Sequence, residues 1–355
     1  MRLNLQKEES YCSNRELLLY LRQVILSYLK TLSIRQRVGV ELDVITLGET
    51  MVLFTPETTG PLRYVHTFNK TIGGAESNFA IALTRLGHEV GWISRLGNDE
   101  FGLYIRNFIR GEGVDTSRVI FDQENPTAVF FKENKPNQDP NVYYYRKQSA
   151  ASAMKPSDLD EEYFKQAKYL HITGVTPALS DSCKATIFRA IELAKKHNQT
   201  IVFDPNIRLK LWSKAEAKQI LTEIAKQSDI ILPGLDEGEL ITGESTPERV
   251  ATSFEELGAK LVVIKLGAKG AYFQSSSQGE YVRGYEVEQI VDTVGAGDGF
   301  AAGLLAGLLK GWDTSKSVKL ANRIGAYALS VNGDVEGYPF WYQVNPDHTK
   351  QEISR

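Results

Sequence analysis

The sequence contains the motif Asp292-Thr293-Val294-Gly295-Ala296-Gly297-Asp298, and the apolar segment Gly299-Phe300-Ala301-Ala302-Gly303 follows it directly. The small residues allow a close approach of the backbone, and the apolar segment predicts a helix over 298–310. The first N–H groups of that helix and the positive end of its dipole point at one place. The sequence therefore predicts an anion site at the start of this helix.

Asp298 closes this motif, and a carboxylate beside a bound phosphate is normally repulsive. It has a use there if it accepts the proton of a hydroxyl that attacks the phosphate. The other interpretation is that Asp298 is a helix N-cap and that the glycines form a tight left-handed turn. The motif is not the dinucleotide fingerprint GxGxxG, because Phe300 stands where that pattern needs glycine.

Strand-like and helical segments alternate through the second half of the chain. Strands are predicted at 169–173, 200–203, 230–232 and 261–266, helices near 180–196, 215–226, 235–257 and 315–331, and a hairpin at 271–289. Such alternation implies parallel strands joined by crossover helices. The predicted fold class is therefore α/β with a mostly parallel central sheet.

The first half of the chain adds a buried strand at 43–48 and a second helix that opens on glycines. This helix starts with Gly73-Gly74, and Asn78, one turn in, can offer a donor and an acceptor to a polyol. The alternative is a simple glycine turn with a surface asparagine. Irregular strand-like segments at 51–70 and 126–148 do not suit the parallel sheet, so we expect them to form a small β lid over one end of it.

The composition limits the class of protein. The 355 residues carry 41 Lys+Arg and 44 Asp+Glu, a net charge of −3, which argues against a dedicated nucleic-acid binder. No apolar run is long enough for a membrane-spanning helix. Two cysteines, Cys12 and Cys183, suit a reducing, cytoplasmic setting, and the histidines form no closely spaced pair that would indicate a zinc site.

Residues 1–40 differ from the rest, because they carry a net charge of +4 and apolar residues at helical spacing. Three interpretations stay open. The segment is an amphipathic helix for a membrane surface or a partner, an ordinary accessory helix, or the product of an upstream start that is not used, with translation beginning near Val38 or Val40. We therefore divide the chain into an extension at 1–40, one domain at 41–345 and a polar tail at 346–355.

Together these motifs resemble the two signature regions of the ribokinase-like (PfkB) carbohydrate kinases. The matching segments are Gly73-Gly74 with Asn78, then Leu96-Gly97-Asn98-Asp99-Glu100-Phe101-Gly102, then Asp292 to Asp298. The resemblance implies a ribokinase-like three-layer α/β/α sandwich with a small β-sheet lid, and ATP and Mg²⁺ as cofactors. The sequence has no Walker A motif and no protein-kinase HRD or DFG motif, which suits a family that binds ATP differently.

Three segments resemble the subgroup of this family that acts on 2-keto-3-deoxygluconate. They are Asn141-Val142-Tyr143-Tyr144-Tyr145-Arg146, Asp204-Pro205-Asn206-Ile207-Arg208-Leu209-Lys210-Leu211-Trp212 and Pro233-Gly234-Leu235-Asp236-Glu237-Gly238-Glu239. Arg146 and Arg208 are the candidates for a substrate carboxylate, because arginine pairs well with planar anions. Either arginine alone is also explained by a structural or surface ion pair. Many family members have Asn where Gly234 stands, so the groups that order the metal are less clearly marked here.

The resemblance implies phosphorylation of the C6 hydroxyl of 2-keto-3-deoxygluconate by ATP, with Asp298 as general base. The implied site residues are Gly295, Ala296, Gly297 and Asp298 for catalysis; Gly73, Gly74, Asn78, Tyr144, Arg146, Arg208 and Asp334 for the sugar acid; Lys265, Gly267, Gly270, Asn206 and Asn322 for the nucleotide; and Glu237 for the metal. For Lys265 to Gly270, the alternative is a hairpin turn with solvated lysines.

Two other functions stay open at this point. One is a kinase for a neutral sugar such as fructose or ribose, against which the two arginines and the tyrosine-rich strand argue. The other is a non-catalytic sugar sensor on the same fold, which would not need its base and anion loop intact. We also expect a homo-oligomer through the exposed lid edges, and the wider family suggests a monovalent cation near Asp292.

Overall fold

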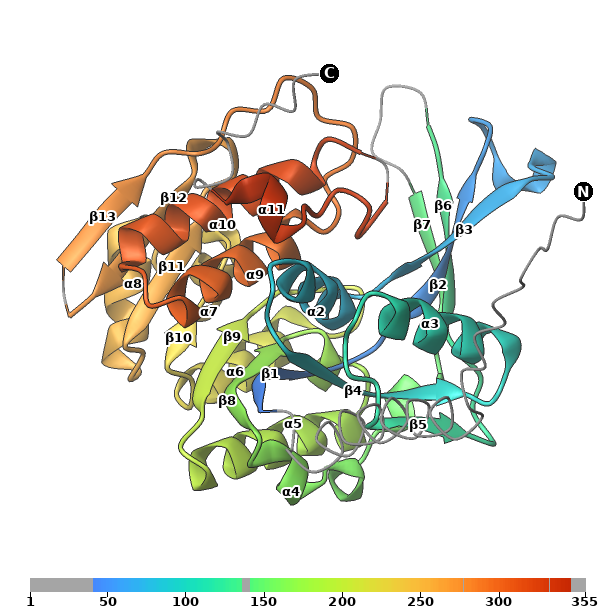
Figure 1. The fold of residues 1–355 in the computed structure, drawn as a ribbon, viewed down its shortest axis with the longest axis horizontal. Coiled ribbons are helices and arrows are strands. Elements are labelled where there is room, and N and C mark those ends of the chain that lie inside the picture. Colours follow the sequence, from blue (N-terminus) through green and yellow to red (C-terminus); the bar gives the residue numbers. More distant parts are fainter. Residues whose placement is uncertain (1–40, 136–140, 277, 332, 346–355) are drawn as a thin grey trace, which may run out of the picture. The chain divides into compact units, whose positions relative to one another are not determined.

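The structure, a computed structural model, describes residues 41–135, 141–276, 278–331 and 333–345 (Figure 1). The chain divides into two units, residues 1–41 and residues 42–355. The interpretations of residues 1–40 and of the tail at 346–355 fall outside the described residues.

The second unit contains a large sheet of nine strands in the order β13-β12-β11-β10-β9-β8-β1-β4-β5. The strands are β1 (Leu42–Leu47), β4 (Val90–Gly97), β5 (Val119–Asp122), β8 (Ala167–Thr173), β9 (Thr200–Asp204), β10 (Ile230–Ile231), β11 (Leu261–Lys265), β12 (Ala271–Ser275) and β13 (Gln278–Val282). The strands from β5 to β11 pair in parallel, and β12 and β13 are added antiparallel. The prediction of a mostly parallel sheet is confirmed.

Helices cover both faces of this sheet, because its strands are apolar on both sides. On β9, Val202 belongs to one buried cluster, while Ile201 and Phe203 belong to the other. The first cluster includes residues of α2 (Ala75–Arg85), α3 (Glu100–Gly111), α9 (Ala296–Leu309) and α10 (Thr314–Ala328), and the second includes residues of α5 (Asp181–Lys196), α6 (Lys214–Ala225), α7 (Leu235–Thr242) and α8 (Pro247–Glu256). The result is the expected three-layer α/β/α arrangement.

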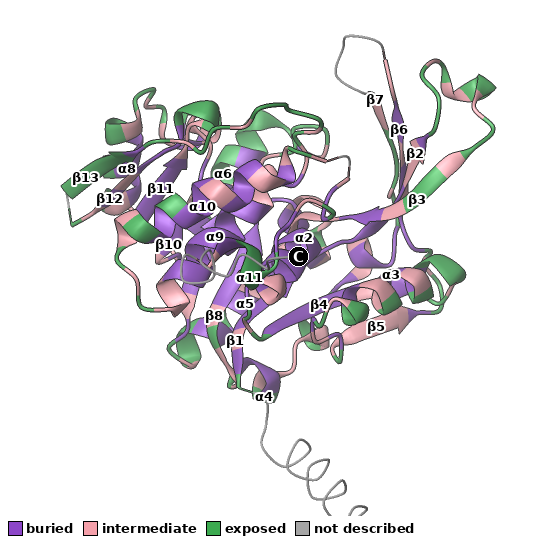
Figure 2. Cartoon of the chain, turned by 45° about the horizontal axis from the view of Figure 1, so that its top comes forward, coloured by how far each residue is buried: buried purple, intermediate pink, exposed green. Residues whose placement is uncertain are grey.

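A second sheet of four strands stands beside the large one (Figure 1). It consists of β2 (Met51–Pro56), β3 (Phe68–Gly73), β6 (Val129–Glu133) and β7 (Asn141–Tyr145), in the order β3-β2-β6-β7. Its edge strands are largely exposed or intermediate, whereas the strands of the large sheet are mostly buried (Figure 2). The two segments that did not suit the parallel sheet thus form a small sheet of their own, which we call the lid.

One predicted helix was wrong in extent. The segment 235–257 is two helices, because Gly243 ends α7 in the left-handed region, at φ +87°, and Pro247 begins α8. Thr246 caps α8 by accepting the N–H of Arg249 with its side chain. A left-handed glycine typically ends a helix, and a proline in the first helical position after an N-cap residue typically begins one.

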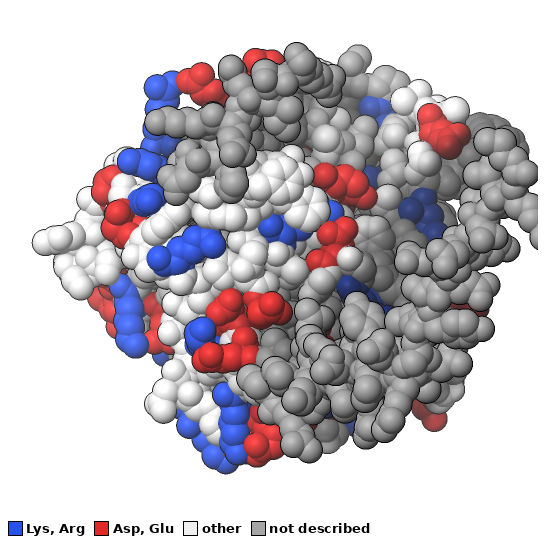
Figure 3. All heavy atoms as spheres, in the orientation of Figure 1, with Lys and Arg blue, Asp and Glu red and all other residues white. Residues whose placement is uncertain are grey.

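The surface seen in Figure 3 mixes the two signs of charge, as expected from the small net charge. Ion pairs between residues three apart on helices, such as Lys184 with Asp181, lie at the surface and contribute little to stability. Among the described residues, no helix is both long and apolar enough to cross a membrane.

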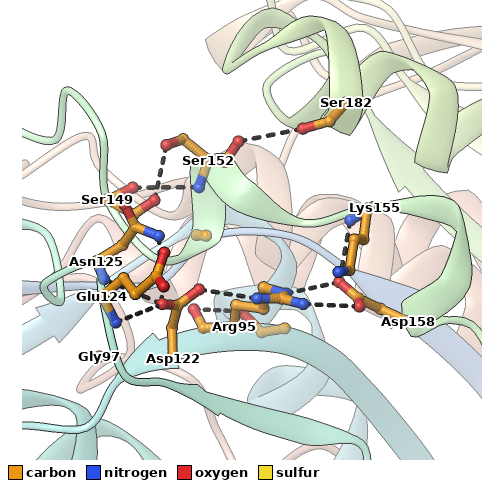
Figure 4. Close-up of polar contacts among 12 residues, drawn as sticks. Arg95, Gly97, Asp122, Glu124, Asn125, Ser149, Ser152, Lys155, Asp158 and Ser182 are labelled. Carbon is orange, nitrogen blue, oxygen red and sulfur yellow. Dashed lines mark hydrogen bonds and ion pairs between the residues drawn. The ribbon is translucent and has the colours of Figure 1, made fainter.

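Arg95 on β4 forms the centre of a polar network that ties three segments together (Figure 4). Its guanidinium lies 2.6 Å and 2.9 Å from the two carboxylate oxygens of Asp158 and 2.8 Å from Asp122 at the end of β5. Burial raises the pKa of Asp122, but the backbone N–H groups of Glu124 and Asn125 and the Arg95 charge lower it more, to about 2. The network fixes the chain just before it enters lid strand β6.

We predict that Arg95→Met lowers the free energy of unfolding by about 3 kcal/mol at neutral pH, because two carboxylates lose their cation. This loss of about 3 kcal/mol is at the low end of the range for breaking a buried ion pair, because the Arg95 side chain is still 14% exposed. The pKa of Asp122 is depressed when folded, so its stabilising contribution is present above about pH 4 and is lost as the pH falls through about 2. Urea unfolding of both proteins between pH 7 and about pH 2 should show the difference shrinking with acid.

The matched control is Arg249→Met on α8, which breaks a surface pair with Glu244. That change should cost below about 1 kcal/mol. Equal losses for the two variants would show that the Arg95 network has no special role.

Candidate active site

The carboxyl ends of the parallel strands meet at one edge of the large sheet, which is where open α/β sheets bind ligands. Glu49 lies just after β1, Asp204 ends β9 and Lys265 ends β11. The N-terminus of α9 faces the same edge, because Gly297 in its first turn lies near Lys265. The Lys265 ammonium is 3.7 Å from the position that a Cβ on Gly297 would take. Residues from distant parts of the chain are thus brought together.

Two cavities open at this edge. One has a volume of about 810 Å³ and the other about 470 Å³. Lys265, Thr293 and Gly297 line both of them. A ligand in one cavity and a ligand in the other would therefore meet at the loop that leads into α9.

The loop has the geometry of an anion site. Gly295, with φ +80°, is the N-cap of α9, and no side chain caps the first N–H groups of this helix. A Cβ on Gly295 would lie 2.4 Å from the carbonyl oxygen of Asp334, so only glycine fits this position. The Tyr338 hydroxyl donates to the Gly295 carbonyl at 2.7 Å and fixes the turn. The left-handed glycine turn is confirmed, but the interpretation of Asp298 as the N-cap is wrong.

Asp298 lies in the first turn of α9 and lines the smaller cavity. The side-chain amides of Asn78 and Asn206 donate to its two carboxylate oxygens, at 2.9 Å and 3.3 Å. Burial raises the pKa of Asp298 to about 7, and the charge of Asp204 adds to the increase. The carboxyl group therefore titrates near neutral pH while it faces a cavity of a size that suits a small polar ligand.

Lys265 is held by a buried carboxylate. Its Nζ lies 2.8 Å from both oxygens of Asp204, which is 1% exposed. Burial lowers the pKa of Lys265, but the opposite charges of Asp204 and Glu237 outweigh this effect and raise it. Lys265 is thus a fixed positive charge between the two cavities, and it is not the solvated hairpin lysine of the alternative interpretation.

Every predicted sugar-side residue lines the 470 Å³ cavity: Gly73, Gly74, Asn78, Tyr144, Arg146, Arg208 and Asp334. Asp334 is buried, which raises its pKa to about 6. A Cβ on Gly73 would lie 2.5 Å from the Asp334 carboxylate, so glycine leaves this space free. The structure therefore brings together residues that the sequence separates by more than two hundred positions.

The two predicted arginines have different surroundings. Arg146 pairs with the buried carboxylate of Glu49 at 2.5 Å, and the Ser149 hydroxyl donates to Glu49 at 2.6 Å. Arg208 is exposed, and its guanidinium donates weakly to the Ile207 carbonyl at 3.4 Å. Arg146 is thus both an ion-pair member and a cavity residue, whereas Arg208 has most of its donors free for a ligand.

The predicted nucleotide-side residues do not all share one cavity. Lys265, Gly267, Gly270 and Asn322 line the 810 Å³ cavity, together with apolar residues such as Ile290 and Leu329. Asn322 uses its amide to donate to the carbonyls of Val282 and Arg283, at 3.4 Å and 3.1 Å. Asn206 lines the smaller cavity instead, where it contacts Asp298.

Glu237, the predicted metal residue, has both carboxylate oxygens engaged by the backbone. It accepts the N–H of Gly234 at 2.7 Å and the N–H of Ile207 at 2.8 Å. Within the described parts of the chain, no group of three or more His, Cys, Asp or Glu side chains could hold a metal. Glu237 is a carboxylate that lines the 470 Å³ cavity, and one or two carboxylates beside substrate phosphates are enough for Mg²⁺, because this ion keeps several waters.

Two charged residues that line the 470 Å³ cavity, Glu49 and Lys132, were not among the predicted site residues. Glu49 follows the first strand directly, where a site residue is common in α/β folds, so its position was a usable signal. Lys132 lies on lid strand β6. To predict it as a site residue, one would need to know which face of this strand points to the cavity, and the sequence does not show that.

Several proteins of known name resemble this chain. A 2-dehydro-3-deoxygluconokinase from Bacillus subtilis (strain 168) is 43% identical over 301 residues, 84% of this chain and 93% of the relative. A protein of the same name from Thermoproteus tenax is 36% identical over 303 residues, which cover 84% of this chain and 91% of that relative. A 5-dehydro-2-deoxygluconokinase from Geobacillus thermodenitrificans (strain NG80-2) is 31% identical over 310 residues, which cover 85% of this chain and 92% of that relative.

Solved structures show the same fold. A PfkB protein from Polaromonas sp. JS666 is 42% identical, with a TM-score of 0.79, and the match covers 86% of this chain and 99% of that one. An E. coli protein named as a ribokinase II, in complex with ATP and Mg²⁺, is 30% identical, with a TM-score of 0.80 and coverage of 85% and 97%.

A family comparison matches residues 41–341 with the pfkB family carbohydrate kinases. The matched range contains both sheets, the loop into α9 and the residues that line the 810 Å³ and 470 Å³ cavities. The resemblance noted in the sequence is thereby confirmed, and the chain belongs to the pfkB family of carbohydrate kinases.

Proposed function

We propose that this chain transfers the γ-phosphoryl group of ATP to the C6 hydroxyl of 2-keto-3-deoxygluconate, giving 2-keto-3-deoxy-6-phosphogluconate and ADP. One observation carries the proposal: two cavities meet at the anion loop, and the carboxylate of Asp298 faces the smaller one. Two relatives named 2-dehydro-3-deoxygluconokinase support the choice of substrate. The E. coli structure with ATP and Mg²⁺ supports the choice of cofactors.

In this mechanism the larger cavity holds the nucleotide and the smaller cavity holds the sugar acid. The phosphates lie along Gly267 to Gly270 and beside Lys265, and the γ-phosphate reaches the N–H groups of Gly295, Ala296 and Gly297. Those N–H groups stabilise the charge on the transferring group, because they are oriented before the reaction starts. The ion pair with Asp204 holds the Lys265 ammonium beside the phosphates.

Asp298 accepts the proton of the C6 hydroxyl as the new O–P bond forms and the bond between the β,γ-bridging oxygen and phosphorus breaks. Asn78 and Asn206 hold the carboxylate in place by donating to its two oxygens. Mg²⁺, when bound, neutralises charge on the phosphate oxygens. Glu237 is the carboxylate that would hold it, with most of its ligands coming from water and phosphate.

The other end of the substrate carries a carboxylate, which neutral sugars lack. Arg208 meets this group with free donors, and Arg146 adds a guanidinium whose charge is balanced by Glu49. Tyr144 lines the same cavity and contacts the substrate hydroxyls or its keto group. The arginines argue against a neutral sugar, and the complete loop and base argue against a non-catalytic sensor.

The test is a coupled ADP-release assay with ATP, Mg²⁺ and four acceptors: 2-keto-3-deoxygluconate, 5-keto-2-deoxygluconate, fructose and ribose. The proposal expects strong turnover with the first. Preference for the second would keep the arginine argument and change the substrate to that of the third relative. Preference for fructose or ribose, or no turnover with any acceptor, would refute the proposal.

Asp298→Asn keeps the shape of the side chain and removes the base. We predict a fall in kcat of about 10²- to 10⁴-fold, the usual contribution of general base catalysis. The KM values should change little, because the asparagine still accepts hydrogen bonds. Steady-state kinetics measure both quantities, and a variant with full turnover would remove Asp298 from the mechanism.

The raised pKa of Asp298 predicts a pH profile. The base must be ionised, and its pKa is about 7, so kcat/KM should fall tenfold per pH unit as the pH drops below about 7. A limb at pH 4 to 5 would show that another group is the base. Asp334→Asn is the control, because Asp334 is the other buried carboxyl with a raised pKa in the cavity, and the limb should stay near pH 7 in that variant.

Arg208→Met should raise the KM for the keto acid by about 10- to 100-fold, the value of one hydrogen-bonded charge pair. Turnover of a neutral sugar should not change, so the preference for the acid over fructose falls by the same factor. Arg189→Met on α5 removes the same charge from an exposed pair and serves as control. An unchanged preference in Arg208→Met would show that Arg208 does not read the carboxylate.

Three further predictions remain part of this proposal. The lid edge strands β3 and β7 favour pairing between copies, so we propose a homo-oligomer, which light scattering tests. We also propose a cytoplasmic location, where ATP is available.

A monovalent cation near Asp292 stays a prediction. The ammonium of Lys132 already lies 2.8 Å from the Asp292 carboxylate.

A further inference from the structure

Lys132 is a buried lysine on lid strand β6, and it lines the 470 Å³ cavity. Its Nζ lies 2.8 Å from a carboxylate oxygen of Asp292 and 3.8 Å from one of Asp334. Asp292 is the first residue of the motif that leads into α9. One ion pair therefore joins the lid to the loop at which the two cavities meet.

The alternation of the lid strand explains how Lys132 reaches this place. Phe130 and Lys132 lie on one face of β6, and Phe130 belongs to the small apolar cluster of the lid together with Ala128, which directly precedes the strand. Phe131 lies on the other face, where it stacks on Phe54. An apolar side chain at position 132 would continue the cluster without the cost of burying a charge. A lysine there is explained by the carboxylates that it meets.

The contacts continue from Asp292 into the loop. The second carboxylate oxygen of Asp292 accepts the N–H of Val294 at 3.1 Å. Val294 directly precedes Gly295, the N-cap of α9. The Lys132 charge thus fixes a carboxylate, and that carboxylate fixes the backbone from which the anion-binding N–H groups start.

The same ammonium compensates the negative charge beside the anion loop. The charge of Asp292 raises the pKa of Asp334, whereas the charge of Lys132 lowers it. Without Lys132, two carboxylates would face each other next to the site of a bound phosphate. Repulsion between them would move the loop and weaken the site for anions.

We propose that Lys132 is a positioning residue, which holds the Asp292–Gly297 loop in its anion-binding geometry and couples that loop to the lid. The effect on catalysis rests on the proposed function, but the effect on the loop does not. The proposal gives the lid a task beyond covering the sugar. When the lid is displaced, the loop loses the cation that shapes it.

The first arm of the test needs no substrate. Amide hydrogen exchange is compared in the wild type, Lys132→Met and the matched control Lys135→Met, which removes the same charge just beyond the same strand. We expect exchange of the Val294 to Gly297 amides to rise by about tenfold or more in Lys132→Met and to stay unchanged in Lys135→Met. Unchanged loop exchange in Lys132→Met would overturn the proposal.

The second arm uses kinetics with whichever acceptor the wild type prefers. Lys132→Met should lose about 10- to 100-fold in kcat, somewhat less than the loss of a direct oxyanion donor. Methylammonium chloride should restore part of this loss, and sodium chloride at equal ionic strength should not. Lys132→Arg should retain more activity than the methionine variant. A folded Lys132→Met enzyme within threefold of wild-type kcat would overturn the coupling.

The two arms separate this proposal from the proposed function. A wild type that phosphorylates none of the four acceptors would refute the function, while loop exchange would still decide the role of Lys132. A wild type that is active on the keto acid, with both Lys132 variants normal in exchange and in kcat, would refute the role of Lys132 alone.

Discussion

Parallel strands that end at a common edge are the constraint on which the rest of this structure depends. Because β1, β8, β9 and β11 run the same way, the residues at their carboxyl ends lie together although the chain separates them widely. Helices cover both faces of the sheet, so ligands reach the protein at that edge. The N-terminus of α9 completes the edge and supplies N–H groups that no side chain uses.

The charges at this edge are arranged in pairs. Asp204 pairs with Lys265, Glu49 with Arg146, and Asp292 with Lys132. Asp298 differs from these carboxylates, because its hydrogen bonds come from the amides of Asn78 and Asn206. Burial raises the pKa of Asp298 to about 7, and the hydrogen bond from Asn78 offsets only part of this rise. The carboxyl group of Asp298 therefore exchanges a proton near neutral pH.

Local patterns in the sequence predicted the fold class, and the family resemblance implied most of the residues that line the 470 Å³ cavity. Alternating apolar segments marked the parallel sheet, and glycines before an apolar helix marked the anion loop. Contacts between distant segments were not predictable in this way. Lys132 and Asp292 are 160 positions apart, and nothing in the lid sequence shows which side of β6 faces the site. Asn206 was assigned to the nucleotide because a motif places the loop but not the direction of its side chain.

A crystal structure of the protein with Mg²⁺, a non-hydrolysable ATP analogue and 2-keto-3-deoxygluconate tests the proposed geometry most directly. We expect the C6 oxygen within about 2.6–3.2 Å of the Asp298 carboxylate, the γ-phosphate at the start of α9 and the substrate carboxylate at Arg208. A sugar acid bound with its carboxylate end beside Asp298, or with the C6 hydroxyl pointing away from α9, would contradict it.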